Sequence, residues 1–325
     1  MPTIEWPGPG ATLPQPHERN TMPLSDVKPI DVHIHPFTVE TRLGHGPSYT
    51  EAHDEYFGRS EEAPHHGRLD IPIETSYETF RGAGIERAVL VNMVSYHRWG
   101  RALPNDYIAE YCRRYPDMFL GLGGVDPHMG AKNAVAELER CVNDLGLLGL
   151  KFHPAYQEVD PADQALMYPI LEACEAMDAA VLIHTGTTRM TYSKIRTCNP
   201  ISIDDVATDF PKLRVIITHF GWPWTAEALA VIWRHENVYL DLSGWLPRYV
   251  YQAEPIVFQY MNTVLQDKFV FGSDYPAIDP KVWLDDFDAI VEQGYVWGGE
   301  RREFRPEVYE KFVRTNALRA LKLDL

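Results

Sequence analysis

The chain has 325 residues, 45% of them hydrophobic and 23% charged, a composition typical of a folded globular protein that argues against a disordered chain. Its formal net charge of −16 argues against nucleic acid and anionic lipid as partners, because phosphate binding requires clustered Lys and Arg. The four cysteines form no CxxC pair, no apolar run reaches the roughly 18–20 residues of a membrane span, and no secretory signal is visible, so we expect a cytoplasmic protein with reduced thiols.

Residues 1–29 are predicted to form an N-terminal arm rather than part of the folded domain. Seven of them are proline, and they show neither a helical nor an alternating pattern of hydrophobic residues. Proline favours an extended backbone, so we expect the arm to lie along the domain or along a partner subunit. The folded domain is expected to occupy residues 30–325.

Eight short apolar runs, rich in β-branched residues, follow along the chain. They predict strands at residues 30–34, 88–93, 119–125, 147–152, 180–184, 215–219, 238–242 and 269–271. Helix-compatible stretches separate most of them, among them residues 133–145, 165–177, 203–210 and 225–235. Alternating strands and helices predict a parallel sheet, and eight such units predict an α/β fold closed into a TIM-like (β/α)8 barrel.

A doubly wound open sheet is the rival fold. It lacks support because the Gly-rich first turn of a dinucleotide-binding fold is missing after residues 30–34, where His33-Ile34-His35-Pro36 stands instead. The link between the first two strands, roughly residues 36–85, is long and polar, so we expect an insertion over one barrel mouth. A helix-like segment over residues 306–323 ends the chain.

Metal-binding residue types recur where the predicted strands end. On the first strand His33 and His35 are two residues apart, which places both imidazoles on one face. The fourth, fifth, sixth and eighth strands are followed or ended by His153, His184, His219 and Asp274. In a barrel all these ends meet at one mouth, where barrel enzymes keep their chemistry. Several His and one carboxylate converging there predict a site for Zn, Mn or Fe.

With these motifs the chain resembles the amidohydrolase superfamily, and within it the branch of aminocarboxymuconate-semialdehyde decarboxylase and the resorcylate-type decarboxylases. The resemblance covers about residues 30–320 and rests on DVHIHP at 31–36, GLKFHP at 149–154, IHTG at 183–186, THFG at 218–221 and FGSDYP at 271–276. It implies a (β/α)8 barrel, in agreement with the strand count, and commonly a homodimer. The arm and much of residues 36–75 lie outside it.

Carried over position by position, the resemblance implies that one divalent metal, Zn or alternatively Mn, is bound by His33, His35, His184 and Asp274. It implies that His219 is the catalytic His that faces the metal-bound water or the substrate.

Two residues of the fourth predicted strand stay open. Lys151 is either a carboxylated bridge between two metals, as in many hydrolases of the superfamily, or a supporting residue beside a single metal, as in the decarboxylase branch. His153 is either a substrate contact or a structural cap before Pro154.

The same residues serve two reactions, so the metal site alone does not separate them. We expect a decarboxylase, a carbon–carbon lyase that acts on an aromatic or unsaturated carboxylic acid, with Asp274 as a candidate proton shuttle. A hydrolase of a lactone, ester or cyclic amide is the alternative, and a non-catalytic barrel that only binds a metal or a metabolite is a third reading.

The substrate carboxylate needs a cation in the loops around the barrel mouth. Arg189 and Arg196 lie in the loop after His184 and are the best placed, with a solvated surface charge as the alternative for each. Trp222 closely follows His219 and is a candidate to stack on a flat ring, with packing of the barrel rim as the alternative. Asp241 is expected to cap a neighbouring loop rather than to bind metal.

Overall fold

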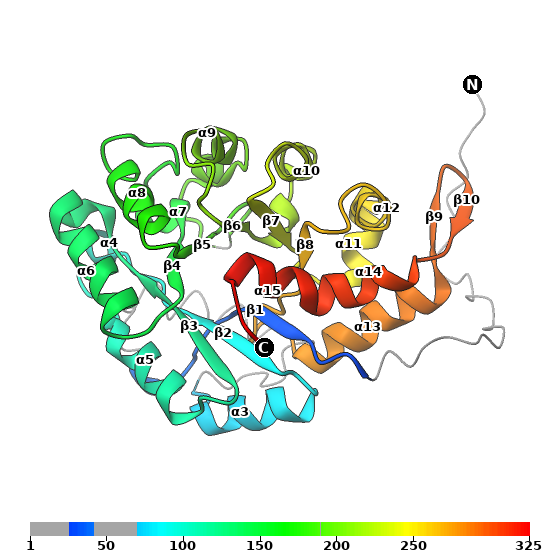
Figure 1. The fold of residues 1–325 in the computed structure, drawn as a ribbon, viewed down its shortest axis with the longest axis horizontal. Helices are drawn as coiled ribbons and strands as arrows, with labels where there is room; N and C mark the ends of the chain where they lie inside the picture. The colour runs from blue at the N-terminus through cyan, green and yellow to red at the C-terminus, as the bar shows by residue number, and fades with distance from the viewer. Residues whose placement is uncertain (1–25, 42–69, 189) are drawn as a thin grey trace.

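The computed structural model describes residues 26–41, 70–188 and 190–325, and these ranges contain eight parallel strands that follow one another in chain order around one sheet (Figure 1). The strands are β1 (Ile30–Ile34), β2 (Arg87–Val91), β3 (Phe119–Gly124), β4 (Gly149–Phe152), β5 (Ala180–Ile183), β6 (Val215–Ile217), β7 (Val238–Asp241) and β8 (Phe269–Val270). Every predicted strand end is within two residues of the observed one, so the predicted barrel is confirmed.

Hydrogen bonds between β1 and the segment after β8 close the sheet into a barrel. The amide of Asp274 donates to the carbonyl of His33 at 2.9 Å, and the amide of His35 donates to the carbonyl of Tyr275 at 2.8 Å. His33, His35 and Asp274 therefore lie on the seam where the barrel closes.

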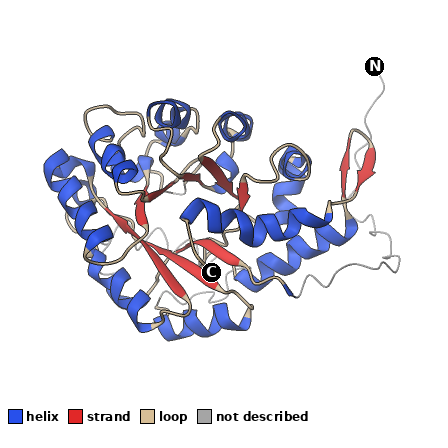
Figure 2. Ribbon diagram, viewed as in Figure 1, coloured by secondary structure: helices blue, strands red, loops and turns tan. Residues whose placement is uncertain are grey.

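Helices cover the outside of the barrel (Figure 2). The longer ones are α3 (Ile73–Gly82), α5 (Asn105–Arg114), α6 (Ala131–Asn143), α8 (Tyr168–Ala176), α9 (Ser202–Asp209), α10 (Thr225–Arg234) and α13 (Pro280–Gln293). Shorter helices are α4 (Tyr96–Trp99), α7 (Pro154–Gln157), α11 (Pro247–Ala253) and α12 (Pro255–Met261). In α6 the buried Ala134, Leu138 and Cys141 recur at three- and four-residue spacing, which gives the helix one apolar face against the strands.

The C-terminal helices close the end of the barrel where the strands begin. The segment consists of α14 (Pro306–Glu310), a π-helical turn (Lys311–Thr315) and α15 (Asn316–Leu321). Ala317 and Leu321 of α15 share an apolar cluster with Ile30 and Ala180, the first residues of β1 and β5. Access to the barrel is therefore left to the opposite end, where the strands finish.

The link between β1 and β2 differs from the predicted insertion. Residues 73–82 form α3, the barrel helix of the first unit, whose buried Ile73, Ser76 and Phe80 lie on one face. Only two of these three residues are apolar, so the sequence pattern was too weak to reveal the helix. Residues 42–69 of the predicted insertion and residues 1–25 of the predicted arm lie outside the described ranges.

A projecting hairpin after α13 was not predicted. Its strands β9 (Tyr295–Trp297) and β10 (Glu300–Arg302) pair antiparallel and extend from the body of the barrel (Figure 1). Gly298 and Gly299 form the two-residue turn with φ values of 62° and 80°, a conformation that favours glycine. None of the helices in the described ranges combines the length and the hydrophobicity that a bilayer crossing requires.

Candidate metal centre

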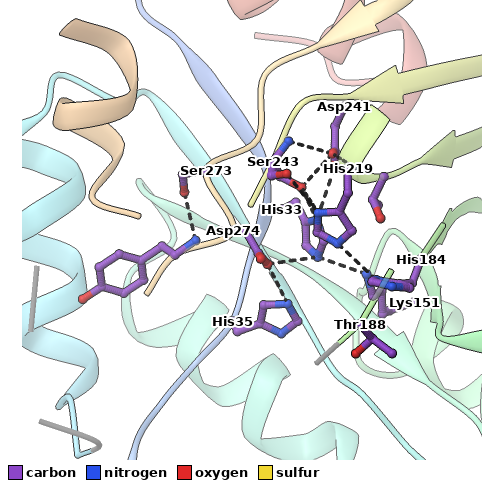
Figure 3. Close-up of polar contacts among 12 residues, drawn as sticks. His33, His35, Lys151, His184, Thr188, His219, Asp241, Ser243, Ser273 and Asp274 are labelled. Atoms are coloured by element: carbon purple, nitrogen blue, oxygen red, sulfur yellow. Dashed lines mark hydrogen bonds and ion pairs between the residues drawn. The ribbon is translucent and has the colours of Figure 1, made fainter. Parts of the chain in front are cut away.

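Side chains from most strands of the barrel meet where the strands finish (Figure 3). Those that the sequence analysis singled out and that lie together there are His33, His35, Lys151, His153, His184, His219 and Asp274. His219 and Asp274 have positive φ values of 58° and 63°, which non-glycine residues rarely adopt. Such backbone strain is typical of functional sites, and here it occurs in the segments that follow β6 and β8.

His33 is held by a carboxylate and a hydroxyl behind it. Its Nδ1 lies 3.2 Å from Asp241 Oδ2 and 3.0 Å from Ser243 Oγ, and the ring has no exposed surface. The Asp241 carboxylate only accepts, so the proton of the neutral ring resides on Nδ1 and Nε2 presents a lone pair. A carboxylate behind one ring nitrogen is the usual support of a metal-binding His.

Asp274 connects His33 of β1 with His35, which follows the strand. Its Oδ1 lies 3.2 Å from His35 Nε2 and 3.8 Å from His33 Nε2. In a tetrahedral site with metal–ligand distances of about 2.0–2.2 Å, neighbouring donor atoms are roughly 3.3–3.6 Å apart. The side chains of His35 and Asp274 are 14% and 21% exposed, so solvent reaches the cluster from this side while His33 lies beneath.

His184 and His219 present two lone pairs to one another. His184 Nε2 lies 3.2 Å from the carbonyl oxygen of Thr187, and His219 Nδ1 lies 3.0 Å from that of Ser243. Carbonyl oxygens only accept, so both ring protons are used in these bonds. The remaining nitrogens, His184 Nδ1 and His219 Nε2, are 3.1 Å apart. Two acceptors at this distance require a cation, either a proton or a metal ion, beside them.

Asp241 and the residues after it form the frame of the site. Asp241 Oδ1 accepts from the amides of His219 at 2.8 Å and of Ser243 at 2.9 Å, which is the capping role predicted for it. Gly244 follows with a φ of 76°, and a Cβ there would be 3.0 Å from His219 Nδ1 and 3.1 Å from Asp274 Oδ2. Only glycine therefore lets the backbone approach both catalytic candidates this closely.

Burial decides the protonation of the cluster. Desolvation holds the pKa of His33 and of His184 well below the usual value and lowers that of His35 to about 3, so these rings are neutral near pH 7. Burial also raises the pKa of the Asp274 carboxyl to about 6, against the opposing pull of His219 and Lys151. Neutral imidazoles and a carboxylate are the ligand forms that a divalent cation needs.

Lys151 reaches the same cluster from β4. Its Nζ lies 3.0 Å from the lone pair of His33 Nε2, and burial lowers the pKa of its ammonium to about 8. A buried Lys that donates to a metal-binding nitrogen competes with a cation for that nitrogen. The tautomers and the neutral donor set fit a divalent cation. Donor atoms of His33, His219 and Asp274 lie within 4.8 Å of one another, whereas His184 groups in this way with His153 and Cys198.

The candidate substrate-binding residues lie in different surroundings. His153 is buried, and its ring stacks between Tyr156 at 3.5 Å and His184 at 3.8 Å. Trp222 is half-buried and packs on Trp245 with 5.2 Å between ring centroids. Arg196 is exposed in the short 3₁₀ helix Ile195–Cys198. Arg189 lies outside the described residues.

Two residues of the site carried no sequence signal. Ser243 joins Asp241 to His33 and His219, and Cys198 has its thiol near His153 and His184. A lone Ser or Cys in a loop has no periodicity that would distinguish it. Tyr156, which the sequence offers as one of several aromatic candidates for stacking on a flat ring, stacks on His153 and contacts Thr188 Oγ1 at 2.6 Å. The strand ends were visible because His and Asp interrupt apolar runs.

The chain matches the model of a family described as Amidohydrolase over residues 30–323. One curated relative, a 2-amino-3-carboxymuconate-6-semialdehyde decarboxylase of Dictyostelium discoideum, is 29% identical over 53% of this chain and 55% of its own length. The match therefore spans about half the length of that relative. A gamma-resorcylate decarboxylase of a Rhizobium species is 26% identical over 68% of this chain and 75% of its own length.

Solved structures with the same fold include an uncharacterised TIM-barrel protein of Bordetella bronchiseptica. It is 26% identical, has a TM-score of 0.74, and the superposition covers 91% of this chain and 99% of that one. A 5-carboxyvanillate decarboxylase of Novosphingobium aromaticivorans, solved with manganese and a nitrobenzoic acid, has a TM-score of 0.62 at 17% identity, covering 94% of this chain and all of that one. At this identity the second likeness concerns the fold alone.

Proposed function

The chain belongs to the amidohydrolase family, and we propose that it is a metal-dependent decarboxylase acting on an aromatic or unsaturated carboxylic acid. The observation that carries the proposal is the pair of facing lone pairs on His184 and His219, with the carboxyl group of Asp274 close to His219. That combination offers a cation site and a proton carrier in one cluster. Two decarboxylases among the relatives support the reaction class.

We propose His33, His35, His184 and Asp274 as the ligands of one divalent cation, Zn or Mn. The manganese of the N. aromaticivorans enzyme supports Mn as a candidate, and the mixed nitrogen and oxygen donor set suits either metal. A bound cation there supplies a positive charge that polarises a substrate oxygen.

The proton in this proposal comes from Asp274. Its side chain is 21% exposed, on the side of the cluster that solvent reaches. The bond between the substrate carbon and its carboxylate breaks, carbon dioxide leaves, and the electron pair left on carbon takes this proton. His219 keeps its Nδ1 proton on the carbonyl of Ser243 and presents Nε2 as a partner for a substrate hydroxyl or carboxylate.

The substrate would be bound by residues around the opening of the barrel. We propose that Trp222 and His153 contact the flat ring and that Arg196 and Arg189 bind the carboxylate. Two contacts support this proposal: the amide of Trp222 donates to the carbonyl of His219 at 3.2 Å, and the His153 ring stacks on His184.

Turnover in isotopically labelled water tests the reaction class. The metal-loaded protein is incubated with panels of aromatic acids, unsaturated acids and lactones, in D₂O and in H₂¹⁸O, and the products are analysed by mass spectrometry. Decarboxylation places one deuterium on carbon and no ¹⁸O in the organic product. Incorporation of ¹⁸O into a ring-opened acid, without release of carbon dioxide, would contradict the proposal.

Hydrolysis is the second candidate because of Lys151. Its Nζ lies 3.0 Å from His33 Nε2, where a carboxylated Lys side chain would reach a second cation next to the first. Intact-mass measurement of the native protein distinguishes the two states, since carboxylation adds about 44 Da to the chain. An uncarboxylated Lys151 is expected for the decarboxylase.

A further inference from the structure

A second group of metal-binding side chains lies outside the site described above. His97 belongs to α4, Asp126 follows β3, and His128 lies in the short 3₁₀ helix Pro127–Met129. One donor atom from each of the three residues lies within 4.8 Å of the other two. All three line a cavity of about 510 Å³, whose walls also include Asn105 of α5 and Glu137 of α6.

Asp126 is the buried member of this group, and backbone amides hold its carboxylate in place. Its side chain is 1% exposed, its Oδ1 accepts from the amide of His128 at 3.0 Å, and its Oδ2 accepts from the amide of His97 at 2.8 Å. Within the described ranges no Lys or Arg forms an ion pair with Asp126. A buried carboxylate needs a compensating cation, and the only candidates in contact with it are the two imidazole rings or an ion that they bind.

The acceptors behind the two rings indicate which nitrogens are free. His128 Nε2 lies 2.7 Å from the carbonyl oxygen of Gln157, so its proton is on Nε2 and Nδ1 holds a lone pair. His97 lies between two carboxylates, with Nε2 3.4 Å from Glu158 Oε2 and Nδ1 3.2 Å from Asp126 Oδ2. A neutral ring has one proton and satisfies only one of these contacts.

A protonated ring would donate to both carboxylates, and a metal ion offers the other arrangement that satisfies both ring nitrogens of His97. With the proton on Nε2 donated to Glu158, His97 Nδ1 becomes a lone pair 3.2 Å from Asp126 Oδ2, close to the roughly 3.3–3.6 Å between neighbouring donors in a tetrahedral site. Each ring then has one nitrogen bonded to an acceptor behind it, Glu158 for His97 and Gln157 for His128, and its other nitrogen free. That is the support normally found behind metal-binding His residues.

We propose that His97, Asp126 and His128 bind a divalent transition metal at a rim site separate from the barrel centre. Two imidazoles and one carboxylate leave coordination positions open, and the adjacent cavity provides room for water or a small anionic ligand at them. The rim site shares no residue with the barrel centre, so it does not depend on the proposed decarboxylation. It also means that two metals per chain would not by themselves make Lys151 a bridging ligand.

Cobalt(II) titration of the metal-free full-length protein tests the rim site, with visible absorption and bound metal per chain as readouts. The test variant is His128→Gln, whose side-chain amide can still donate to the Gln157 carbonyl. The matched control is Met129→Ala, which alters the next residue of the same cavity without removing a nitrogen or oxygen donor. Thermal unfolding of each variant confirms that it is folded.

The wild type and Met129→Ala are expected to bind two Co²⁺ ions per chain, and His128→Gln one. In a His184→Ala background, which disables the barrel centre, one ion should remain and should disappear when His128→Gln is added. Equal binding by wild type and His128→Gln would overturn the rim site and leave a hydrogen-bonded cluster in its place. If the wild type bound one Co²⁺ ion and the His184→Ala protein bound none, the rim site would likewise be overturned, and the barrel centre would be supported.

Discussion

His184 Nδ1 and His219 Nε2 face one another at 3.1 Å, while the other ring nitrogen of each His donates to a backbone carbonyl. These two carbonyls, from Thr187 and Ser243, impose the tautomers, because a carbonyl oxygen cannot donate. The two lone pairs therefore require a cation beside them, either a proton or a metal ion.

Asp274→Asn should abolish activity and weaken metal binding while leaving the barrel folded. The amide is almost the same size as the carboxylate, but it carries no charge for the cation and no acidic proton for the substrate. Bound metal per chain and turnover are the measurements. Asp285→Asn, on the outer surface of α13, is the matched control and should leave both unchanged.

His219→Ala should retain the metal yet lose most turnover, by about 10²–10⁴-fold, the usual contribution of a positioned acid–base or charge-stabilising group. The proposed ligand set does not include His219, so metal content should stay near that of the wild type. Steady-state kinetics and metal analysis of the same preparation check this. Loss of the metal in this variant would move His219 among the ligands.

Asp241→Asn should weaken metal binding by about 10–100-fold, because the carboxylate behind His33 holds its tautomer and orientation. The amide can rotate and donate toward His33 Nδ1, which would shift the imidazole proton to Nε2 and remove the lone pair. Competition with a chromophoric chelator measures the change. Unaltered affinity would show that Ser243 alone positions the His33 ring.

Metal removal should lower thermal stability. A ligand present at about 100 times its dissociation constant adds about 2.7 kcal/mol to the free energy of unfolding, which corresponds to a rise of about 5 °C in Tm for a domain of this size. Scanning calorimetry with and without chelator provides the comparison. In the variant His184→Ala combined with His128→Gln, which removes both proposed metal sites, the shift on adding metal should be largely lost.

The metal-free protein should lose stability as the pH falls from about 7 to 5. Burial lowers the folded-state pKa of four imidazoles, those of His33, His35, His153 and His184. Below about pH 6.5 the unfolded chain therefore binds more protons at these residues than the folded chain does. Asp31 and Asp274, with pKa values raised to about 7 and about 6, act in the opposite direction but are fewer. Urea unfolding at several pH values measures the net slope, and a stability that rises toward pH 5 would contradict this balance.

The parts of the site that the sequence predicted are those attached to strands. Buried strands in a barrel are near-continuous apolar runs, so His33, His184, His219 and Asp274 stood out as polar breaks at equivalent strand ends, and the barrel topology brings such ends together. Homodimer formation and the cytoplasmic location stay predictions.

The parts that the sequence did not predict depend on long-range contacts. Ser243 acts through its position between Asp241, His33 and His219, and the rim group joins residues from the loops after two different strands, β2 and β3. His97, Asp126 and His128 lie 29 and 2 residues apart along the chain, a spacing that matches no local motif. Only the folded arrangement of these loops shows that the three side chains meet.

Anomalous X-ray diffraction from crystals of the manganese-loaded protein, collected to emphasise the metal signal, locates the bound cation directly. We expect a peak bounded by His33, His35, His184 and Asp274, with the His219 ring beside it and not bonded to it. Absence of a peak among these residues in fully loaded crystals would contradict the metal centre, and with it the proposed decarboxylase.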